Sequence, residues 1–202
     1  MCTVAVHVGP QFLMIANRDE ALDRPSSPPA NRGEIFAPRD EVAGGTWWGV
    51  NRRRMLCAIT NRFGHARDPD RKSRGLLVLD ALHQGLVFHD GATITRRDLV
   101  PGWNVVTERS LTPALEPVRE ARVLAALGAH IPTPEEARAI LSVHVTSDDP
   151  LAATCVHFGS VYGTRSSSYL ALGPAPRLLH SEGPPCVTAP VDMSEALASF
   201  LG

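Results

Sequence analysis

The chain has 202 residues, a length typical of one domain, and 44% of them are hydrophobic, which is enough to bury a proper core. Its 20 Lys and Arg are spread among 21 Asp and Glu, and the formal net charge is −1. Because no basic tract could follow phosphates, the sequence argues against nucleic acid or an acidic membrane surface as a partner. It has no amino-terminal leader pattern and no apolar run near the ~20 residues of a membrane helix. We therefore expect a single cytoplasmic domain over residues 1–202, with no membrane insertion.

The cysteines and histidines show no known metal or redox pattern. The four cysteines lack CxxC or CxxCH spacing; they are Cys2, Cys57, Cys155 and Cys186. Among the eight histidines, the pairs His83 with His89 and His144 with His157 lack i, i+4 spacing or cysteine partners. We therefore expect no metal and no resident cofactor, and we expect three of the cysteines to be small buried apolar residues.

The first expected elements are two strands joined by a tight turn. Residues 2–8 and 11–17 are rich in β-forming residues, and Gly9-Pro10 between them is a turn dipeptide. The second run is apolar on both faces, which indicates a strand covered on both sides. A hairpin symmetric about Gly9-Pro10 would place Cys2 opposite Asn17.

The remaining elements alternate between strand-rich and helix-rich regions. Residues 22–45 predict a long surface loop, because they are rich in Pro, Arg, Asp and Gly. Strands are expected over 46–50, 55–60, 154–158, 167–172 and around 178–179. Helices are expected over 73–83, 112–127, 133–143 and 192–201, with Thr133 and Glu136 as a capping box and Asp192 and Glu195 as a second capping pair. Strands, then helices, then strands again predict an α+β layered sandwich.

A candidate catalytic group lies at the amino terminus. Removal of Met1, usual before a small residue, would leave Cys2 with both a thiol and a free α-amine. Their ordinary pKa values are ~8.5 and ~8, so a positive environment would give appreciable thiolate near neutral pH while the amine shuttles the proton. The predicted pairing brings Cys2 beside the polar run of residues 17–20, in which Arg18 could supply that charge and Asp19 could orient the amine. Alternatively, Cys2 is only an edge-strand residue and Arg18 pairs with a neighbouring carboxylate in a surface turn.

Six short blocks occur in the order found in a known family. They are MCT at 1–3, IANRDE at 15–20 with RP at 24–25, GGTWWG at 44–49, AITN at 58–61, SRG at 73–75 and YGTR at 162–165. Together they resemble the NRDE family, also called transport and Golgi organisation 2. The resemblance implies an Ntn-hydrolase-like fold, a four-layer αββα sandwich with antiparallel sheets, with Cys2 in the nucleophile position. It also suggests kinship with cysteine amidases such as penicillin V acylase, bile-salt hydrolase and acid ceramidase.

The same resemblance implies roles for further residues. Arg18 and Asp19 would be the arginine and acidic residue that follow the second strand in the amidases. Asn61 would help to form the oxyanion site, where a well-placed donor is worth ~3 kcal/mol. Arg165 would be the arginine that enters the site from the last third of the chain.

Four other residues are candidates for substrate binding. Asn17 and Glu20 belong to the polar run, and Trp47 is adjacent to Trp48, so that only one of the two should line a pocket while the other joins the core. Glu108 stands about where the amidases have an asparagine. A carboxylate there would raise the pKa of the thiol and repel an oxyanion.

These observations leave three interpretations. The first is hydrolysis of a non-peptide C–N bond of a small or acyl-bearing substrate through an acyl-enzyme on Cys2. The second is a non-catalytic carrier that binds a hydrophobic ligand in the same cleft, favoured by Glu108 and a shortened middle region; haem or an acyl conjugate is an example, and haem rests on the resemblance alone. The third is a structural scaffold, which an intact Met1 would favour. Substrate, pathway and oligomeric state stay open.

Overall fold

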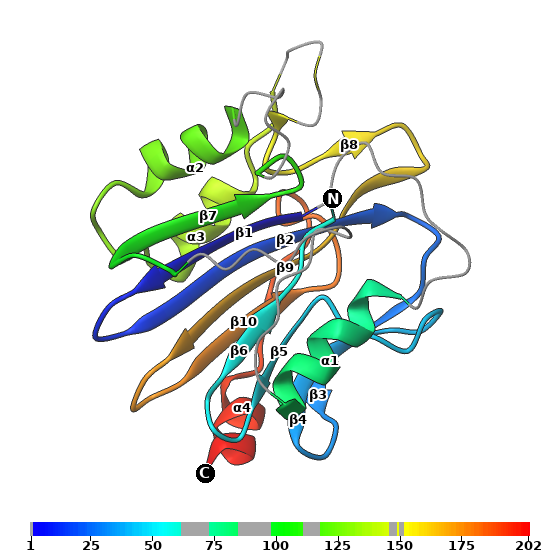
Figure 1. Cartoon of the computed structure of the whole chain (residues 1–202). Helices are drawn as coiled ribbons and strands as arrows, with labels where there is room; N and C mark the ends of the chain where they lie inside the picture. The colour runs from blue at the N-terminus through cyan, green and yellow to red at the C-terminus, as the bar shows by residue number, and fades with distance from the viewer. Residues whose placement is uncertain (1, 62–72, 85–97, 111–117, 146–148, 150–151) are drawn as a thin grey trace.

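Four layers, in the order helix, sheet, sheet, helix, make up the described part of the chain (Figure 1). The computed structural model describes residues 2–61, 73–84, 98–110, 118–145, 149 and 152–202. The α+β sandwich expected from the sequence is confirmed, and its layer order is the one that the resemblance implies. None of the helices in this part has the length and apolar character needed to span a membrane.

The larger sheet is antiparallel and has β2 near its centre. Its strand order is β11-β10-β9-β2-β1-β7, and β8 pairs with the outer part of β9. The strands are β1 (Cys2–Val8), β2 (Phe12–Ala21), β7 (Gly102–Thr107), β8 (His157–Phe158), β9 (Tyr162–Leu172), β10 (Arg177–Ser181) and β11 (Val191–Asp192). Seven consecutive residues of β2 are buried, which confirms the strand covered on both faces. Neither β7 nor β11 was among the expected strands.

The register of the first hairpin differs by one residue from the expected one. Cys2 pairs with Arg18 and Thr3 with Asn17, so the predicted pairing of Cys2 with Asn17 is wrong. The reason is a longer connection: three residues, Gly9 to Gln11, separate the strands instead of two. The shift matters for the site, because the arginine of the polar run lies directly across from the cysteine.

The smaller sheet corrects the largest error in the sequence prediction. Its order is β3-β4-β5-β6, with β3 (Ser26–Asn31), β4 (Ile35–Asp40), β5 (Trp48–Asn51) and β6 (Leu56–Ala58). The first two of these strands occupy residues 22–45, which were expected to form a surface loop. Pro28 and Pro29 are tolerated because β3 is an edge strand and its pairing with β4 is irregular between Ser27 and Ala30. The apolar run of β4, which begins at Ile35, is buried.

Four helices lie in the described ranges, close to the expected positions. They are α1 (Arg74–Gln84), α2 (Val118–Leu127), α3 (Pro134–Leu141) and α4 (Ser194–Leu201). Residues 112–117, the expected start of the second helix, lie outside the described residues. The capping box of Thr133 and Glu136 is confirmed. The capping pair expected at Asp192 is wrong, since Met193 is the N-cap of α4 and Asp192 lies in β11.

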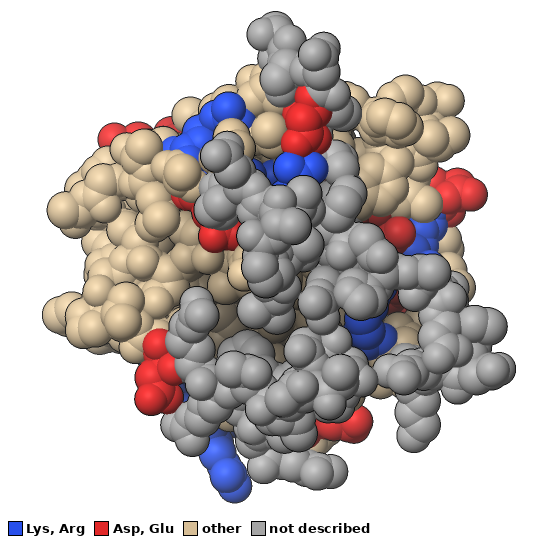
Figure 2. All heavy atoms as spheres, turned by 45° about the horizontal axis from the view of Figure 1, so that its top comes forward, with Lys and Arg blue, Asp and Glu red and all other residues tan. Residues whose placement is uncertain are grey.

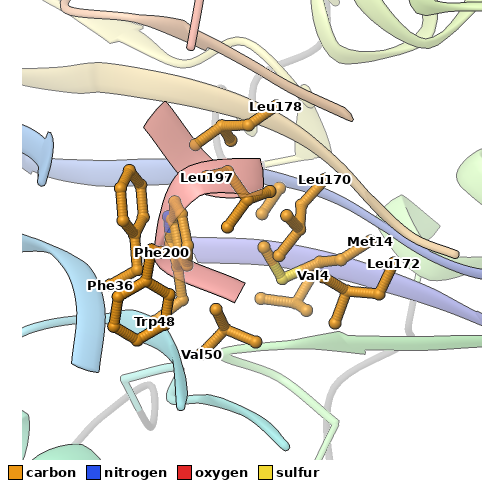
Figure 3. Close-up of a cluster of buried hydrophobic side chains, with 11 residues drawn as sticks. Val4, Met14, Phe36, Trp48, Val50, Leu170, Leu172, Leu178, Leu197 and Phe200 are labelled. Atoms are coloured by element: carbon orange, nitrogen blue, oxygen red, sulfur yellow. The ribbon is translucent and has the colours of Figure 1, made fainter. Parts of the chain in front are cut away.

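Three clusters of buried side chains hold the layers together. Between the sheets, Val4, Met14 and Leu170 of the larger sheet meet Phe36 and Trp48 of the smaller one, with Phe200 of α4 at the edge (Figure 3). On the outer face of the larger sheet, α2 and α3 cover Ala5, Leu13 and Ile15. On the outer face of the smaller sheet, α1 covers Ile35 and Ala37. Buried apolar area of this kind is the main driving force for the fold.

Candidate functional site

The chain begins at the end of the larger sheet where β1 and β2 lie side by side, as the terminus label in Figure 1 shows. Cys2 is the first residue of β1, and its backbone lies opposite Arg18 of β2. The next residue along β2 is Asp19. The structure thus brings three of the predicted catalytic positions to one end of the sandwich through backbone pairing alone.

A β-bulge interrupts the pairing of β2 with β9 at the same point. Arg18 pairs with Ser166 and Asp19 with Thr164, so Arg165 is the extra residue. Bulges change the direction of side chains and often occur next to sites of function. Arg165 donates from Nη2 to the backbone carbonyl of Arg24 at 3.3 Å, which places it over the turn that follows β2.

Arg18 contacts residues of both sheets. Its guanidinium carbon lies 4.2 Å from the centre of the Trp47 ring, and its Nη2 lies 3.8 Å from Asp40 Oδ2 and 4.0 Å from Glu20 Oε2. Arg24 donates to the same Asp40 oxygen from Nε at 2.8 Å and Nη2 at 2.7 Å. We call these five residues the Arg18 group.

Ion pairs between arginines and carboxylates balance the charges of the Arg18 group. Although burial opposes the ionisation of Asp40, the hydrogen bonds and attraction of Arg24 keep the pKa of this carboxyl below its ordinary value. Asp40 is therefore a carboxylate over the physiological range. It holds Arg24 in place, while the Trp47 ring and the nearby carboxylates hold Arg18, whose side chain is only 4% exposed.

Asp19 belongs to a separate set of buried polar residues, the Asp19 network, at which α2 meets the larger sheet. Its Oδ1 accepts a hydrogen bond from Thr164 Oγ1 at 2.7 Å, and its Oδ2 lies 3.2 Å from Arg119 Nη1. The same Arg119 nitrogen donates to Thr3 Oγ1 at 3.2 Å and to Glu108 Oε2 at 3.3 Å. These five side chains are all buried.

The Asp19 carboxyl is poised to exchange a proton near neutral pH. Its burial raises its pKa from 3.8 to about 6, against the opposing effects of the Arg119 charge and the Thr164 hydrogen bond. Burial disfavours the charged form of an acid, and here it outweighs an ion pair. A shifted carboxyl of this kind beside the start of the chain is a candidate functional group.

Glu108 lies in the same network, with 1% of its side chain exposed. It forms ion pairs with Arg119 and, from Oε1 at 3.7 Å, with Arg109 Nε. Two guanidinium groups therefore balance its charge inside the protein. These ion pairs lessen the effect that the Glu108 carboxylate was expected to have on the thiol and on an oxyanion.

Three other predicted residues have defined positions. Asn17 donates both amide hydrogens to backbone carbonyls, those of Leu141 at 2.9 Å and Thr154 at 2.7 Å, so these hydrogens hold the fold together. Glu20 is part of the Arg18 group and is 29% exposed. Asn61 lies shortly after β6. The hydroxyl of the preceding residue, Thr60, donates to the carbonyl of Thr107 at 3.5 Å.

The contact of Thr60 places Asn61 at the same end of the sandwich as the first residues of the chain. Thr107 is the last residue of β7 and pairs with Thr3 of β1. The end of the smaller sheet therefore meets the larger sheet beside the chain start. The structure thus brings the predicted oxyanion residue into the same region as Cys2.

The two tryptophans have different surroundings. Trp48 is 1% exposed, lies in the cluster between the sheets and donates from Nε1 to Ser168 Oγ at 3.2 Å. Trp47 lies in the bend before β5, so strand alternation does not extend to it, and it packs against the same cluster. Its other contact is the guanidinium of Arg18.

Sequence reasoning missed several polar residues, because no motif marks them. Arg119 and Thr164 complete the Asp19 network, and Asp40 belongs to the strand that was mistaken for a loop. A second group was also missed. His144 and His157 do have cysteine partners, since Cys155 and Cys186 lie with them in one cluster; the expectation that such partners are absent is wrong.

Charge is mixed among the described side chains on the face that includes this end. Figure 2 shows basic and acidic side chains of this part of the chain next to one another at several places.

The first 99 residues match the family model described as "Transport and Golgi organisation 2". By this match, residues 1–99 belong to the transport and Golgi organisation 2 family. A Transport and Golgi organization 2 homolog of Mus musculus is 39% identical over 74 residues, which are 34% of this chain and 27% of the mouse protein. The alignment thus spans about a quarter of that relative's length. Cys2, Arg18, Asp19 and Asn61 lie inside the part that matches the family model, and Arg165 lies beyond it.

Proposed function

We propose that Cys2, once Met1 has been removed, is the nucleophile of an amidase that cleaves a non-peptide C–N bond of a small or acyl-bearing substrate. The observation that carries this proposal is the register of the first hairpin: Cys2 lies opposite Arg18, and a buried carboxyl with a pKa of about 6 follows at Asp19. In this proposal Cys2 supplies the nucleophile, Arg18 opposite it supplies a fixed positive charge, and Asp19, the next residue of β2, supplies a carboxylate that holds the α-ammonium.

The reaction balances with the groups of Cys2 alone. The thiol gives its proton to the α-amine, and the sulfur forms a bond to the substrate carbonyl carbon. The C–N bond then breaks, and the leaving amine takes the proton from the α-ammonium, which leaves a thioester on Cys2. Water adds to the thioester after giving a proton to the α-amine, and the proton returns to the sulfur as the carboxylic acid leaves.

The Arg18 group supports this chemistry through its charge. Arg18 and Arg24 oppose Asp40 and Glu20, and Arg165 adds a further positive charge above the same turn. The local balance is therefore positive, which favours a thiolate over a thiol. Stacking on Trp47 fixes the guanidinium of Arg18, so little reorganisation is needed when charge develops.

Asp19 and Asn61 take the two remaining roles. In its ionised form the Asp19 carboxylate orients the α-ammonium of Cys2, the residue that precedes Thr3 of the same network. Asn61 donates to the oxyanion of the tetrahedral intermediate, because the end of β6 reaches the start of β1 through Thr60 and Thr107.

The carrier function receives less support than the amidase. It was favoured by Glu108 and by the shortened middle region, and Glu108 is paired with Arg119 and Arg109. A small described pocket, with a cavity volume of about 20 Å³, lies between α3 and β9, and its lining contains no His, Cys or Met. Tyr169 is the one lining residue of a type that binds haem iron, but a cavity of this volume does not hold a haem, so we assign no step to haem.

The test is amide hydrolysis by the full chain. After mass spectrometry has established that Met1 is absent, release of free amine is measured for a panel of N-acyl amides of increasing acyl length. We expect turnover by the wild type and by Cys57→Ala, and none by Cys2→Ala. We also expect an acyl adduct on Cys2 after rapid quenching. Equal release by Cys2→Ala, or no release from any amide by a chain that lacks Met1, would contradict the proposal.

A further inference from the structure

Four metal-ligating side chains converge at a place distinct from the Cys2 site. They are His144, Cys155, His157 and Cys186, and one ligand atom of each lies within 4.8 Å of those of the others. The two sulfurs are 3.6 Å apart. His157 Nε2 lies 3.5 Å from Cys155 Sγ and 3.4 Å from Cys186 Sγ. The rings of His144 and His157 have their centres 4.9 Å apart.

The three separations among the ligand atoms of Cys155, His157 and Cys186 match the edges of a tetrahedral zinc site. Zn–S and Zn–N bonds of about 2.3 and about 2.0 Å imply S···S and S···N distances of about 3.8 and about 3.5 Å around the metal. The observed distances of 3.6, 3.5 and 3.4 Å agree with these values. Two sulfurs and two imidazole nitrogens are a ligand set that zinc prefers.

The backbone holds the four ligands in place from three directions. His144 follows α3, and the preceding carbonyl of Val143 accepts a hydrogen bond from Cys155 N at 3.0 Å. His157 is fixed in β8 by its pairing with Gly163 of β9. The Cys186 turn is tied to α3, because Arg138 Nε donates to the carbonyl of Pro185 at 2.9 Å.

We propose that this chain binds one Zn²⁺ through His144, Cys155, His157 and Cys186. Four protein ligands leave no position for water or substrate, so the site is structural and not catalytic. On binding, each thiol gives its proton to solvent, and the two thiolates balance the charge of the ion. The ion joins the end of α3, β8 and the turn between β10 and β11.

The site has a link to the Asp19 network but does not depend on it. Val156, between two of the ligands, donates from its backbone nitrogen to Thr164 Oγ1 at 2.9 Å, and Thr164 donates to Asp19 at 2.7 Å. Zinc would therefore hold the segment that supports Asp19. Metal binding tests the zinc site directly. The result does not depend on whether the chain has amidase activity.

The experiment measures metal directly in the full chain. Protein is purified without chelators, and zinc is quantified by plasma mass spectrometry for the wild type, Cys186→Ser and His144→Ala. The matched controls are Cys57→Ser, a half-buried cysteine elsewhere, and His83→Ala, an exposed histidine of α1. We expect one zinc per chain in the wild type and both controls, and a loss of most bound zinc in both ligand variants. His144 is exposed, so its replacement should not prevent folding.

A second measurement uses Co²⁺ as a spectroscopic probe. Chelator-treated, reduced wild type should take up Co²⁺ and show the intense visible bands of a tetrahedral thiolate site, and excess Zn²⁺ should abolish them. Absence of these bands, or equal bands in Cys186→Ser and His144→Ala, would overturn the proposal. So would a purified chain with a Cys155–Cys186 disulfide that takes up no metal after reduction.

Discussion

Asp19 combines complete burial with an ion pair, and the balance between the two sets its chemistry. An ion pair to Arg119 alone would lower the pKa of a carboxyl, as Arg24 does for the less buried Asp40. At Asp19, loss of solvent outweighs the attraction, and the pKa rises to about 6. The loss of hydration in a buried ion pair often costs as much free energy as the attraction between the charges contributes. The presence of such a pair at Asp19 therefore suits a functional role.

The raised pKa of Asp19 predicts a specific dependence of stability on pH. Between about pH 4 and about pH 6 the folded chain holds a proton that the unfolded chain has released, so the free energy of unfolding falls as pH rises through this window. Asp19→Asn removes this term. We therefore expect the destabilisation caused by Asp19→Asn to be larger at about pH 4 than at about pH 7, by about 2 kcal/mol.

Urea unfolding at several pH values measures this difference. Asp80→Asn, on the exposed face of α1, is the control and should show no such trend. A destabilisation by Asp19→Asn that grows as pH rises would show that the pKa of Asp19 is lowered in the fold, contrary to the assignment.

At the level of elements, Gly45 and Gly75, which lie in two of the family blocks, allow two backbone segments to approach closely. A Cβ added to Gly45 would lie 2.5 Å from the carbonyl carbon of Gly75, and one added to Gly75 would lie 2.9 Å from the carbonyl oxygen of Thr46. The backbones also share a hydrogen bond from Thr46 N to Gly75 O at 3.1 Å. The segment that contains Gly45 therefore packs closely against the start of α1, where the block at residues 73–75 lies.

Gly45→Ala should therefore destabilise the contact between α1 and the smaller sheet. Because the clash is with backbone, which cannot move aside as a side chain can, we expect a loss of about 1–3 kcal/mol in the free energy of unfolding. Gly173→Ala is the matched control, since its Cβ would meet only Gln11 Cγ at an ordinary 3.8 Å. Equal stability of the two variants in urea unfolding would contradict this packing.

Local patterns predicted some elements and missed others for physical reasons. The capping box at Thr133 and the all-apolar run of β2 act locally or through simple burial, so the sequence reveals them. The strand β3 contains two prolines and reads as a loop, and only its position at the edge of a sheet makes it a strand. The first hairpin was found, but its register depends on the length of its turn.

Across the whole molecule, the Cys2 site combines short-range and long-range contacts. The polar run of residues 17–20 is visible in the sequence, and Cys2 reaches it through one hairpin. Arg119 reaches Asp19 only because α2 packs on the larger sheet. The zinc ligands lie between residues 144 and 186 and meet through α3, β8 and the β10–β11 turn, which no spacing rule describes. Contacts between residues so far apart in the sequence can be recognised only once the fold is known.

Labelling of the intact chain tests whether Cys2 is a free and activated thiol. The other cysteines should react slowly: burial raises the pKa of Cys57 to about 11 and that of Cys155 to about 12, and the proposed zinc would cover Cys155 and Cys186. The purified chain is treated briefly with a limiting amount of iodoacetamide at neutral pH, and its intact mass and labelled position are determined.

We expect a chain without Met1 that takes a single label at Cys2, and no label in Cys2→Ser under the same conditions. An intact Met1, or a label spread evenly over the cysteines, would contradict it.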